Sequence, residues 1–479
     1  MEPPKSPSKV KFSILRYSKQ RWASKVGVIV LVMVFLLLGL YLALNHGNGH
    51  AMLKVSYYTV VVDCGSTGTR VNVYEWMKGG VSRRNLPILL HSYPDNTKKS
   101  PFWKHSCQYH CFQTEPGLDK FVGNSTGISA SLEPLLTWAE KLVRHERRAD
   151  TPIFVLATAG LRRLAVEDAN QVLEDLEAVI KGHLFMYRKS WIRVLSGSEE
   201  AYYGWVALNY KMGIFGNYSS SPTLGLLDLG GSSLQVVMEI DERSDDMHII
   251  RSKLGSIESQ ILAYSLPAFG LNEAFDRTVM MLSHNQSREI TGYRSELRHP
   301  CLSSDFVQNY TCYSCSGLDV NNQENHAQLQ KDELPSFYLV GDQNWDQCKE
   351  IATAAAINSS TINLSRPAVG KNGSGIINLN AVGQPTTRFH ALSGFFVVYN
   401  MLDLSPKANL TKLWDLGQRL CSESQAGLSS ISANPNYAGH FCFRLPFMTS
   451  LIENALCLGD TDIIFGPGDV SWTVRSCAG

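Results

Sequence analysis

Two short segments of the sequence each place an acidic residue before a glycine-rich turn. Residues 63–70 read DCGSTGTR and residues 228–235 read DLGGSSLQ, and both follow an apolar run. Glycine-rich turns let several backbone N–H groups converge on one anion, and neighbouring hydroxyl groups add donors. Two ordinary β-turns are the alternative for either segment taken alone. We predict that the phosphate-binding residues of the two segments are Gly65, Ser66, Thr67, Gly68, Thr69, Gly230, Gly231 and Ser232.

The acidic residues of these segments, Asp63 and Asp228, suit a hard divalent cation. Mg²⁺ and Ca²⁺ bind carboxylate oxygens and retain water, so two carboxylates facing one cleft can hold a hydrated ion that bridges phosphate oxygens. An aspartate that caps its own turn is the alternative. The sequence has no Walker A, Gly-x-Ser-x-Gly or His-Glu-x-x-His motif, which excludes the commoner NTPase, esterase and zinc-protease classes.

Apolar periodicity predicts the strands and helices that position these segments. In the first half of the chain, strands are expected at 57–63, 70–76, 86–93, 152–160 and 191–197. Helices are expected around Leu132–Val143 and Val172–Ile180 and over 198–210. In the second half, strands are expected at 224–231, 234–240 and 247–255, and a helix over 272–282.

This order predicts a duplicated α/β fold. Three antiparallel strands followed by alternating helix and strand is the order of a ribonuclease-H-like lobe, and the two acidic turns begin 165 residues apart. Each turn therefore opens its own lobe, and both turns face one cleft. We expect the first lobe at 57–220, the second at 221–447, and a return segment to the first lobe at 448–479.

The N-terminal region predicts a membrane anchor. Residues 26–44 contain no charge, and 19 residues is roughly the length that an apolar bilayer core requires of a helix. The tail before it, 1–25, is strongly basic, so the positive-inside rule leaves it cytosolic and places the remainder in a lumen or outside the cell. A cleaved signal peptide is the alternative. With a formal net charge of +1 and no basic face beyond the tail, no nucleic-acid partner is expected.

Sequons and cysteines fit an oxidising, luminal compartment. Eleven cysteines are present. Cys421 and Cys442 are expected to pair, and a separate cluster with three possible pairings is formed by Cys301, Cys312, Cys315 and Cys348. Zinc at Cys312 and Cys315, and a metal site in place of a short disulfide loop at 105–111, are the alternatives. The N-x-S/T sequons lie at Asn124, Asn217, Asn285, Asn309, Asn358, Asn363, Asn372 and Asn409.

Five motifs carry a resemblance to a known family. They read DCGSTGTR at 63–70, ATAGLR at 157–162, GSEEAYYGW at 197–205, DLGGSSLQ at 228–235 and GDVSW at 468–472. In this order and at these separations they resemble the apyrases, also called nucleoside triphosphate diphosphohydrolases, over residues 57–473. GSTGTR is more similar to plant apyrases and Golgi nucleoside diphosphatases than to the vertebrate cell-surface enzymes. The resemblance implies the actin-like superfold, with a nucleotide cleft between the lobes.

The resemblance also implies a reaction and roles for individual residues. Nucleoside tri- or diphosphates of the ATP, ADP, GDP and UDP class would be hydrolysed to the monophosphate and phosphate, with Ca²⁺ or Mg²⁺ held through water by Asp63 and Asp228. Glu200 would activate the water, helped by Ser233 and Gln235. Thr158 would contact phosphate, and Arg162 would secure its loop. The nucleobase would stack on aromatic residues of the second lobe, namely Phe395, Phe396 and Tyr399.

Three further residues and the C-terminus modify this interpretation. Adjacent Glu199 points about 100° away on a helix and is expected to be structural. Arg70 suits either a phosphate or an ion pair between structural elements. Cys64 stands where the family usually has alanine, and the family pattern stops after Thr473. A membrane-anchored glycoprotein that binds nucleotide without turnover is therefore the alternative function. A single N-terminal anchor favours the Golgi or secretory pathway over the plasma membrane.

Overall fold

The computed structural model describes residues 56–80, 86–94, 112–216, 222–240, 247–286, 296–313, 315, 335–357, 377, 388–407, 409–424, 427 and 439–473. Residues Tyr57–Gly479 form one compact unit. The expected anchor at 26–44, the basic tail and the cysteine-containing segment 105–111 lie outside the described residues. Within the described residues, no helix combines the length and apolar character needed to cross a bilayer.

The first sheet is built from the segments expected to be strands. Its order is β3-β2-β1-β5-β6, with the first two pairings antiparallel and the last two parallel. A short strand, β4 (Gln113–Thr114), adds to β2. The strands are β1 (Tyr57–Cys64), β2 (Thr69–Met77), β3 (Ile88–Tyr93), β5 (Ile153–Ala157) and β6 (Ile192–Val194).

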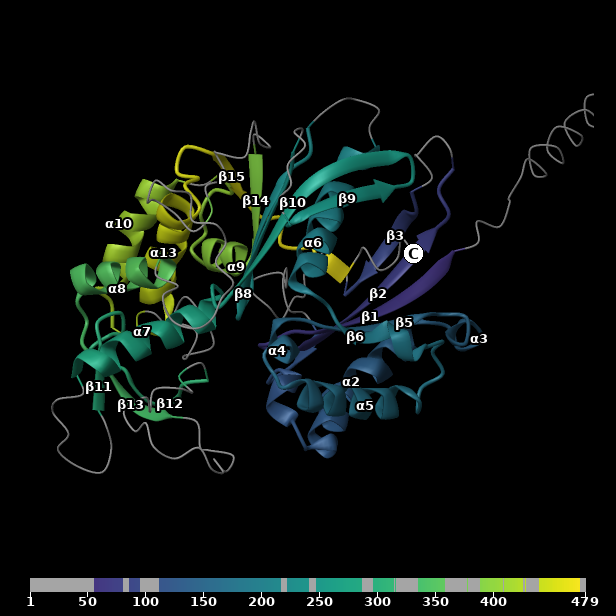
Figure 1. The fold of residues 1–479 in the computed structure, drawn as a ribbon, viewed down its shortest axis with the longest axis horizontal. Helices are drawn as coiled ribbons and strands as arrows, with labels where there is room; N and C mark the ends of the chain where they lie inside the picture. Colours follow the sequence, from purple (N-terminus) through teal and green to yellow (C-terminus); the bar gives the residue numbers. More distant parts are fainter. Residues whose placement is uncertain are drawn as a thin grey trace, which may run out of the picture. The chain divides into compact units, whose positions relative to one another are not determined.

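Helices cover this sheet with their apolar faces. Leu132, Leu136, Val172 and Leu176 are buried with Val60, Val62 and Val155 of the strands in one cluster. Figure 1 shows two of these helices, α2 and α5, next to each other. The helical segments are η2 (Leu118–Phe121), α2 (Ser125–Leu142), α3 (His145–Arg148), α4 (Ala159–Arg162), α5 (Val166–Ile180), η3 (Lys189–Trp191), α6 (Gly197–Lys211) and η4 (Ile214–Gly216).

The second sheet repeats the first, with one extra edge strand. Its order is β9-β10-β8-β7-β14-β15, antiparallel up to β7 and parallel beyond it. Strands β10, β8, β7, β14 and β15 thus correspond to β3, β2, β1, β5 and β6, which confirms the expected duplication. The strands are β7 (Gly225–Leu229), β8 (Ser233–Glu239), β9 (Ile249–Leu254), β10 (Ile257–Pro267), β14 (Arg388–Ser393) and β15 (Asp462–Phe465).

A helical layer and a small third sheet complete the second half. Helices α8, α10 and α13 pack against one another, as Figure 1 shows. The helical segments are α7 (Leu271–Gln286), α8 (Trp345–Ile357), α9 (Gly394–Met401), α10 (Leu410–Leu420), α13 (Phe441–Ser450) and η6 (Leu451–Ala455). The third sheet has the order β11-β13-β12 and consists of β11 (Glu296–His299), β12 (Val307–Thr311) and β13 (Ser336–Gly341).

The structure differs from two of the expected lobe boundaries. Helix α6 was assigned to the first lobe, yet Ala201, Trp205 and Leu208 are buried in one cluster with β7, β8 and β10 of the second sheet. The return segment was expected to start at 448, yet β15 completes the second sheet, and among the described residues that follow it Trp472 and Thr473 contact the first sheet. There Trp472 packs beside Val61 and Tyr74, and the Tyr74 hydroxyl lies 2.5 Å from Thr473 Oγ1.

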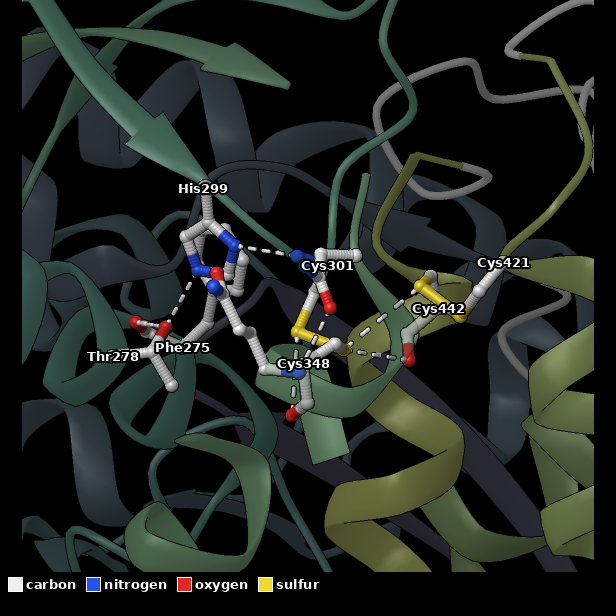
Figure 2. The surroundings of a disulfide bond; sticks show 9 residues. Phe275, Thr278, His299, Cys301, Cys348, Cys421 and Cys442 are labelled. Carbon is white, nitrogen blue, oxygen red and sulfur yellow. Dashed lines mark hydrogen bonds between the residues drawn. A yellow bond between two sulfur atoms is a disulfide. The ribbon is translucent and has the colours of Figure 1, made fainter. Parts of the chain in front are cut away.

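Three disulfides and a buried histidine stabilise the described part of the second half; Figure 2 shows the histidine with the disulfides Cys301–Cys348 and Cys421–Cys442. Cys421 pairs with Cys442, as expected, and the cluster pairs as Cys301–Cys348 and Cys312–Cys315, which excludes zinc at the last two. His299 stacks on Phe275, accepts a hydrogen bond from the Cys301 backbone N–H at Nδ1, and lies 2.8 Å from Thr278 Oγ1 through Nε2. The neutral ring satisfies both contacts.

Acid is expected to destabilise this core through its histidines. Burial lowers the pKa of His299 to about 3, and also that of His440, where Arg444 and His299 act in the same direction. An unfolded histidine has a pKa near about 6.5, so the unfolded state binds more protons below that pH. The two neutral histidines therefore cost no stability above a pH of about 6.5. As the pH drops from about 6.5 towards 3, the free energy of unfolding falls by about 1.4 kcal/mol per pH unit for each histidine.

Urea unfolding at pH 7.5 and 5.0 measures this loss, and His299→Gln isolates one contribution. The variant keeps an N–H donor but does not titrate, so its stability is expected to fall less between the two pH values than that of the native chain. Equal losses in the two proteins would contradict the assignment of the acid sensitivity to His299.

Candidate active site

The two acidic turns have the same construction. Asp63 and Asp228 are each the penultimate residue of their strand, opposite Arg70 and Gln235 respectively on the returning strand. The backbone N–H of Gly65 donates to the Gly68 carbonyl at 3.0 Å, and that of Gly230 donates to the Ser233 carbonyl at 2.9 Å. The repeated sequence pattern therefore produces the repeated hairpin.

The turns lie in direct contact across the two sheets. A Cβ atom added to Gly231 would lie 2.7 Å from Thr67 Cγ2 and 3.0 Å from Ser66 Oγ. A Cβ added to Gly270, at the start of the following helix, would lie 2.3 Å from the Ser232 backbone nitrogen. Only glycine permits these approaches, which bring two sets of backbone donors to one place.

A cavity of about 420 Å³ opens where the turns meet. Gly68 and Thr69 do not line it, contrary to expectation. Thr69 is fully buried at the start of β2, and Gly68 lies against the Thr114 carbonyl of β4. The other residues expected to contact phosphate, metal or water all line it, together with Arg70: Asp63, Gly65, Ser66, Thr67, Thr158, Glu200, Asp228, Gly230, Gly231, Ser232, Ser233 and Gln235.

Glu200 enters the cavity from the first turn of α6. Ser196 and Glu199 form a reciprocal capping box that determines where this helix begins. Glu199 also pairs with Arg193 at 2.9 Å, which confirms its structural role. One residue further on, the Glu200 Oε2 accepts a hydrogen bond from Arg162 Nη2 at 2.7 Å. Burial raises the pKa of Glu200 to about 7, and the charge and hydrogen bond of Arg162 oppose this rise.

Burial also raises the pKa of Asp63 and of Asp228. For Asp63 the Arg70 guanidinium, 3.3 Å away, opposes the rise, and the charge of Asp228 adds to it. For Asp228 a hydrogen bond from Ser393 and the charge of Arg70 oppose it. Three carboxylates thus surround one buried cavity near two arginines, a set of hard oxygen donors that fits a divalent cation.

Arg70, Thr158, Ser233 and Gln235 complete the first layer around this cavity. Arg70 also donates to Gln113 at 3.1 Å and to Thr67 at 3.4 Å, so it supports the first turn as well as Asp63. Thr158 lies between β5 and α4. The Gln235 side-chain nitrogen donates to Ser233 Oγ at 2.7 Å. This hydrogen bond keeps together the two residues that are expected to hold the attacking water.

The aromatic residues expected to stack on a nucleobase lie in the core and do not line this cavity. Phe395 is fully buried, Phe396 is 9% exposed and Tyr399 is 5% exposed. Tyr399 stacks on Phe465 of β15 with ring centroids 4.1 Å apart, and its hydroxyl donates to the Lys407 carbonyl. Helix α9 is apolar on most of its surface because it is packed on several sides.

The cavity is also lined by residues to which sequence reasoning assigned no role, among them Asn272, Ser393, Arg444 and Trp472. Ser393 hydrogen-bonds Asp228 and has a φ of 53°, which is uncommon without glycine and typical of strain at functional sites. Arg444 is a cation in the otherwise apolar helix α13, which is a signal that could have been noticed. Trp472 belongs to the GDVSW motif.

Comparisons with known proteins agree with this geometry. A probable apyrase 7 of Arabidopsis thaliana is 35% identical over 444 residues, which cover 91% of this chain and 58% of that protein. A guanosine-diphosphatase of Schizosaccharomyces pombe is 30% identical over 260 residues, covering 52% of this chain and 43% of that protein. The chain thus spans less than two thirds of the length of either relative.

A solved structure of nucleoside triphosphate hydrolases from Neospora caninum matches with a TM-score of 0.53 and 15% identity, covering 88% of this chain and 92% of that one. At this identity the match supports the fold alone, a mixed α/β fold. The model of the GDA1/CD39 (nucleoside phosphatase) family matches residues 51–461. With both glycine turns and the carboxylates in one cavity, the chain belongs to the GDA1/CD39 (nucleoside phosphatase) family.

Proposed function

We propose that this protein hydrolyses nucleoside tri- or diphosphates to the monophosphate and inorganic phosphate. The observation that carries the proposal is the burial of Glu200, with a pKa near about 7, in the cavity that both glycine turns line. A carboxylate with this pKa is partly deprotonated at neutral pH and can accept a proton from water. The apyrase and guanosine-diphosphatase relatives are named for reactions of this class.

The two turns bind and orient the terminal phosphate. The backbone N–H groups of residues 66–67 and 231–233 are the donors, together with the hydroxyls of Ser66 and Thr67. The Ser232 hydroxyl donates to Glu273 at 3.2 Å, so Ser232 contributes its backbone to phosphate binding. Positioning and charge neutralisation provide most of the rate acceleration in phosphoryl transfer, because little covalent chemistry is asked of the protein.

Glu200 orients the attacking water and takes its proton. The water oxygen forms a bond to the terminal phosphorus, the bond from phosphorus to the bridging oxygen breaks, and the nucleotide product leaves with that oxygen. Ser233 and Gln235 hold the water beside Glu200. Arg162 favours the deprotonated form of Glu200, which is the form that can accept a proton.

Asp63 and Asp228 would hold Ca²⁺ or Mg²⁺ through its water ligands. When bound, such a cation neutralises charge on the phosphate oxygens. It would also offset the repulsion between these two buried carboxylates, for which Arg70 alone compensates only in part.

Replacement of Glu200 tests the proposal. Glu200→Gln keeps the shape but removes the base, so we expect kcat for phosphate release from ATP, ADP, GDP and UDP to fall by about 10²- to 10⁴-fold while nucleotide binding persists. Phosphate release in Ca²⁺, Mg²⁺ or EDTA and nucleotide binding by calorimetry are the measurements.

Glu199→Gln is the matched control, because Glu199 is the carboxylate next to Glu200 in the sequence and forms the capping box of α6 with Ser196. It is expected to lower stability by about 1 kcal/mol and to leave turnover within a few-fold of native. A folded native chain that binds nucleotide without releasing phosphate would support a nucleotide-binding glycoprotein and refute the enzyme proposal. Full turnover by Glu200→Gln would instead show that the protein is an enzyme in which Glu200 is not the base.

Arg162→Met is expected to raise the pKa of Glu200 above its native value, because the charge and hydrogen bond that oppose its rise are lost. Glu200 is active when deprotonated, so activity is lost as the pH falls through its pKa. The acid limb of the profile of kcat/KM against pH should therefore move to higher pH, by about one unit or more. Arg193→Met, which removes the partner of Glu199, should leave the limb in place. An unmoved limb in Arg162→Met would contradict the assignment.

We also propose that 26–44 is an uncleaved signal anchor, with 1–25 cytosolic and the enzyme in the lumen of the Golgi or secretory pathway. The lobes would then comprise 57–220 and 221–447, with the boundary corrections described above. The length and apolarity of 26–44 and the basic tail support the anchor. The sequon residues Asn124, Asn309 and Asn409 are exposed, which suits glycosylation.

Expression of the whole chain in a eukaryotic cell tests this topology. We expect an endoglycosidase-sensitive membrane protein whose catalytic part is protected from protease in intact microsomes. Asn124→Gln should remove one glycan without releasing the protein from the membrane. An unglycosylated chain that protease digests without detergent would refute luminal placement.

A further inference from the structure

A row of charged residues outside the cavity links the two phosphate-binding turns. It consists of Asp119 of η2, Arg163 just after α4, and Glu273 of α7, and none of the three lines the cavity. Arg163 Nη2 lies 3.2 Å from Asp119 Oδ2, and Arg163 Nη1 donates to Glu273 Oε1. Arg163 therefore bridges a carboxylate of the first half of the fold and a carboxylate of the second half.

Asp119 is packed against the first turn. A Cβ atom added to Gly117 would lie 2.5 Å from the Ser66 carbonyl oxygen and 2.7 Å from Asp119 Oδ1. A Cβ added to Gly160 would lie 3.0 Å from both Asp119 Oδ1 and Ser66 Cα. The carboxylate thus touches the segments that surround Ser66, and a change in its position is transmitted to that turn.

Glu273 is joined to the second turn by hydrogen bonds. Its Oε1 accepts from the Ser232 hydroxyl at 3.2 Å. The first residues of α7 are held by the same turn, because the Leu271 N–H donates to the Gly230 carbonyl at 3.0 Å and the Asn272 N–H to the Gly231 carbonyl at 2.9 Å. The position of Glu273 therefore sets the position of residues 230–232.

The burial of these carboxylates makes the arginine important. The side chains of Asp119 and Glu273 are 3% and 7% exposed, whereas that of Arg163 is 34% exposed. An exposed ion pair contributes little, but a buried carboxylate that loses its cation keeps its desolvation penalty. Lys120 also lies 3.0 Å from Asp119 and 3.4 Å from the centre of the Tyr313 ring, a second contact between the two halves.

We propose that Arg163 is a positioning residue that holds the two phosphate-binding turns at a fixed separation by bridging Asp119 and Glu273. The inference rests on the proposed function, since it concerns how the same site grips a nucleotide phosphate. It adds a residue that the ATAGLR motif does not contain, and that acts through its two neighbours without touching the substrate. We call Asp119, Arg163, Glu273 and Ser232 the inter-turn bridge.

Substitution of Arg163 separates positioning from simple stabilisation. In Arg163→Met the turns are no longer held together, so KM for ADP is expected to rise by about fivefold or more. A merely structural role would lower the folded fraction and the apparent kcat but leave KM unchanged. Arg163→Lys restores the charge but cannot contact both carboxylates as a planar fork, so its KM should lie between those of the native chain and Arg163→Met.

Two controls sharpen the test. Arg388→Met removes another arginine–carboxylate ion pair, with Asp462 at 2.7 Å, that is more exposed and lies entirely within the second sheet, and it should leave KM unchanged. The acid limb of the pH profile in Arg163→Met should coincide with the native one, because Glu200 and Arg162 are not altered. In a double-mutant cycle, Arg163→Met with Glu273→Gln should raise KM less than the product of the two single effects.

Amide hydrogen exchange without nucleotide tests the bridge independently of catalysis. In Arg163→Met, peptides that cover 228–235 and 270–275 should exchange faster than in the native chain, and a peptide that covers β14 should not change. This readout stays valid if no nucleotide is hydrolysed, so failure of the proposed function and failure of the bridge can be distinguished. Unchanged exchange in these peptides, or a KM within twofold of native in Arg163→Met, would overturn the inference.

Discussion

The burial of three carboxylates around one cavity is the constraint on which the rest of the site depends. Burial raises the pKa values of Asp63, Asp228 and Glu200; the charge of Asp228 further raises the pKa of Asp63, and the charges of both aspartates further raise the pKa of Glu200. Arg70 and Arg162 offset part of this penalty. Such a cluster lowers the stability of the folded state through desolvation of the carboxylates. It is most readily explained by the proposed functions of the site, which are to bind a ligand of opposite charge and to accept a proton from water.

Duplication of one sheet topology gives this cavity its near-symmetry. Because β1 and β7 occupy equivalent places in their sheets, Asp63 and Asp228 emerge at equivalent ends, and each is followed by a turn of backbone donors. Helix α6 breaks the symmetry. It follows the first sheet in sequence but packs on the second, and its first turn delivers Glu200 to the cavity where the two glycine turns meet. A single carboxylate from α6 therefore lies where the two glycine turns meet.

Contacts behind the cavity matter as much as those that line it. The capping box of Ser196 and Glu199 sets the start of α6 and hence the direction of Glu200. Ser232, which sequence reasoning treated as a phosphate ligand, directs its hydroxyl away to Glu273. Active-site geometry is typically maintained by such supporting groups, whose own positions are determined by packing and charge pairing.

The sequence by itself determined the family, the succession of strands that opens each half of the fold, and most of the expected residues that line the cavity. These follow from local signals: an acid at a strand end, glycines in a turn, and apolar periodicity within one element. The pairing within the cysteine cluster, the core position of Phe395 and Tyr399, the packing of α6 and β15 on the second sheet, and the bridge through Arg163 required the tertiary structure. Each of these features depends on which residues from distant parts of the sequence come into contact. The sequence pattern of an apolar helix is the same whether its aromatic side chains fill a core or contact a ligand.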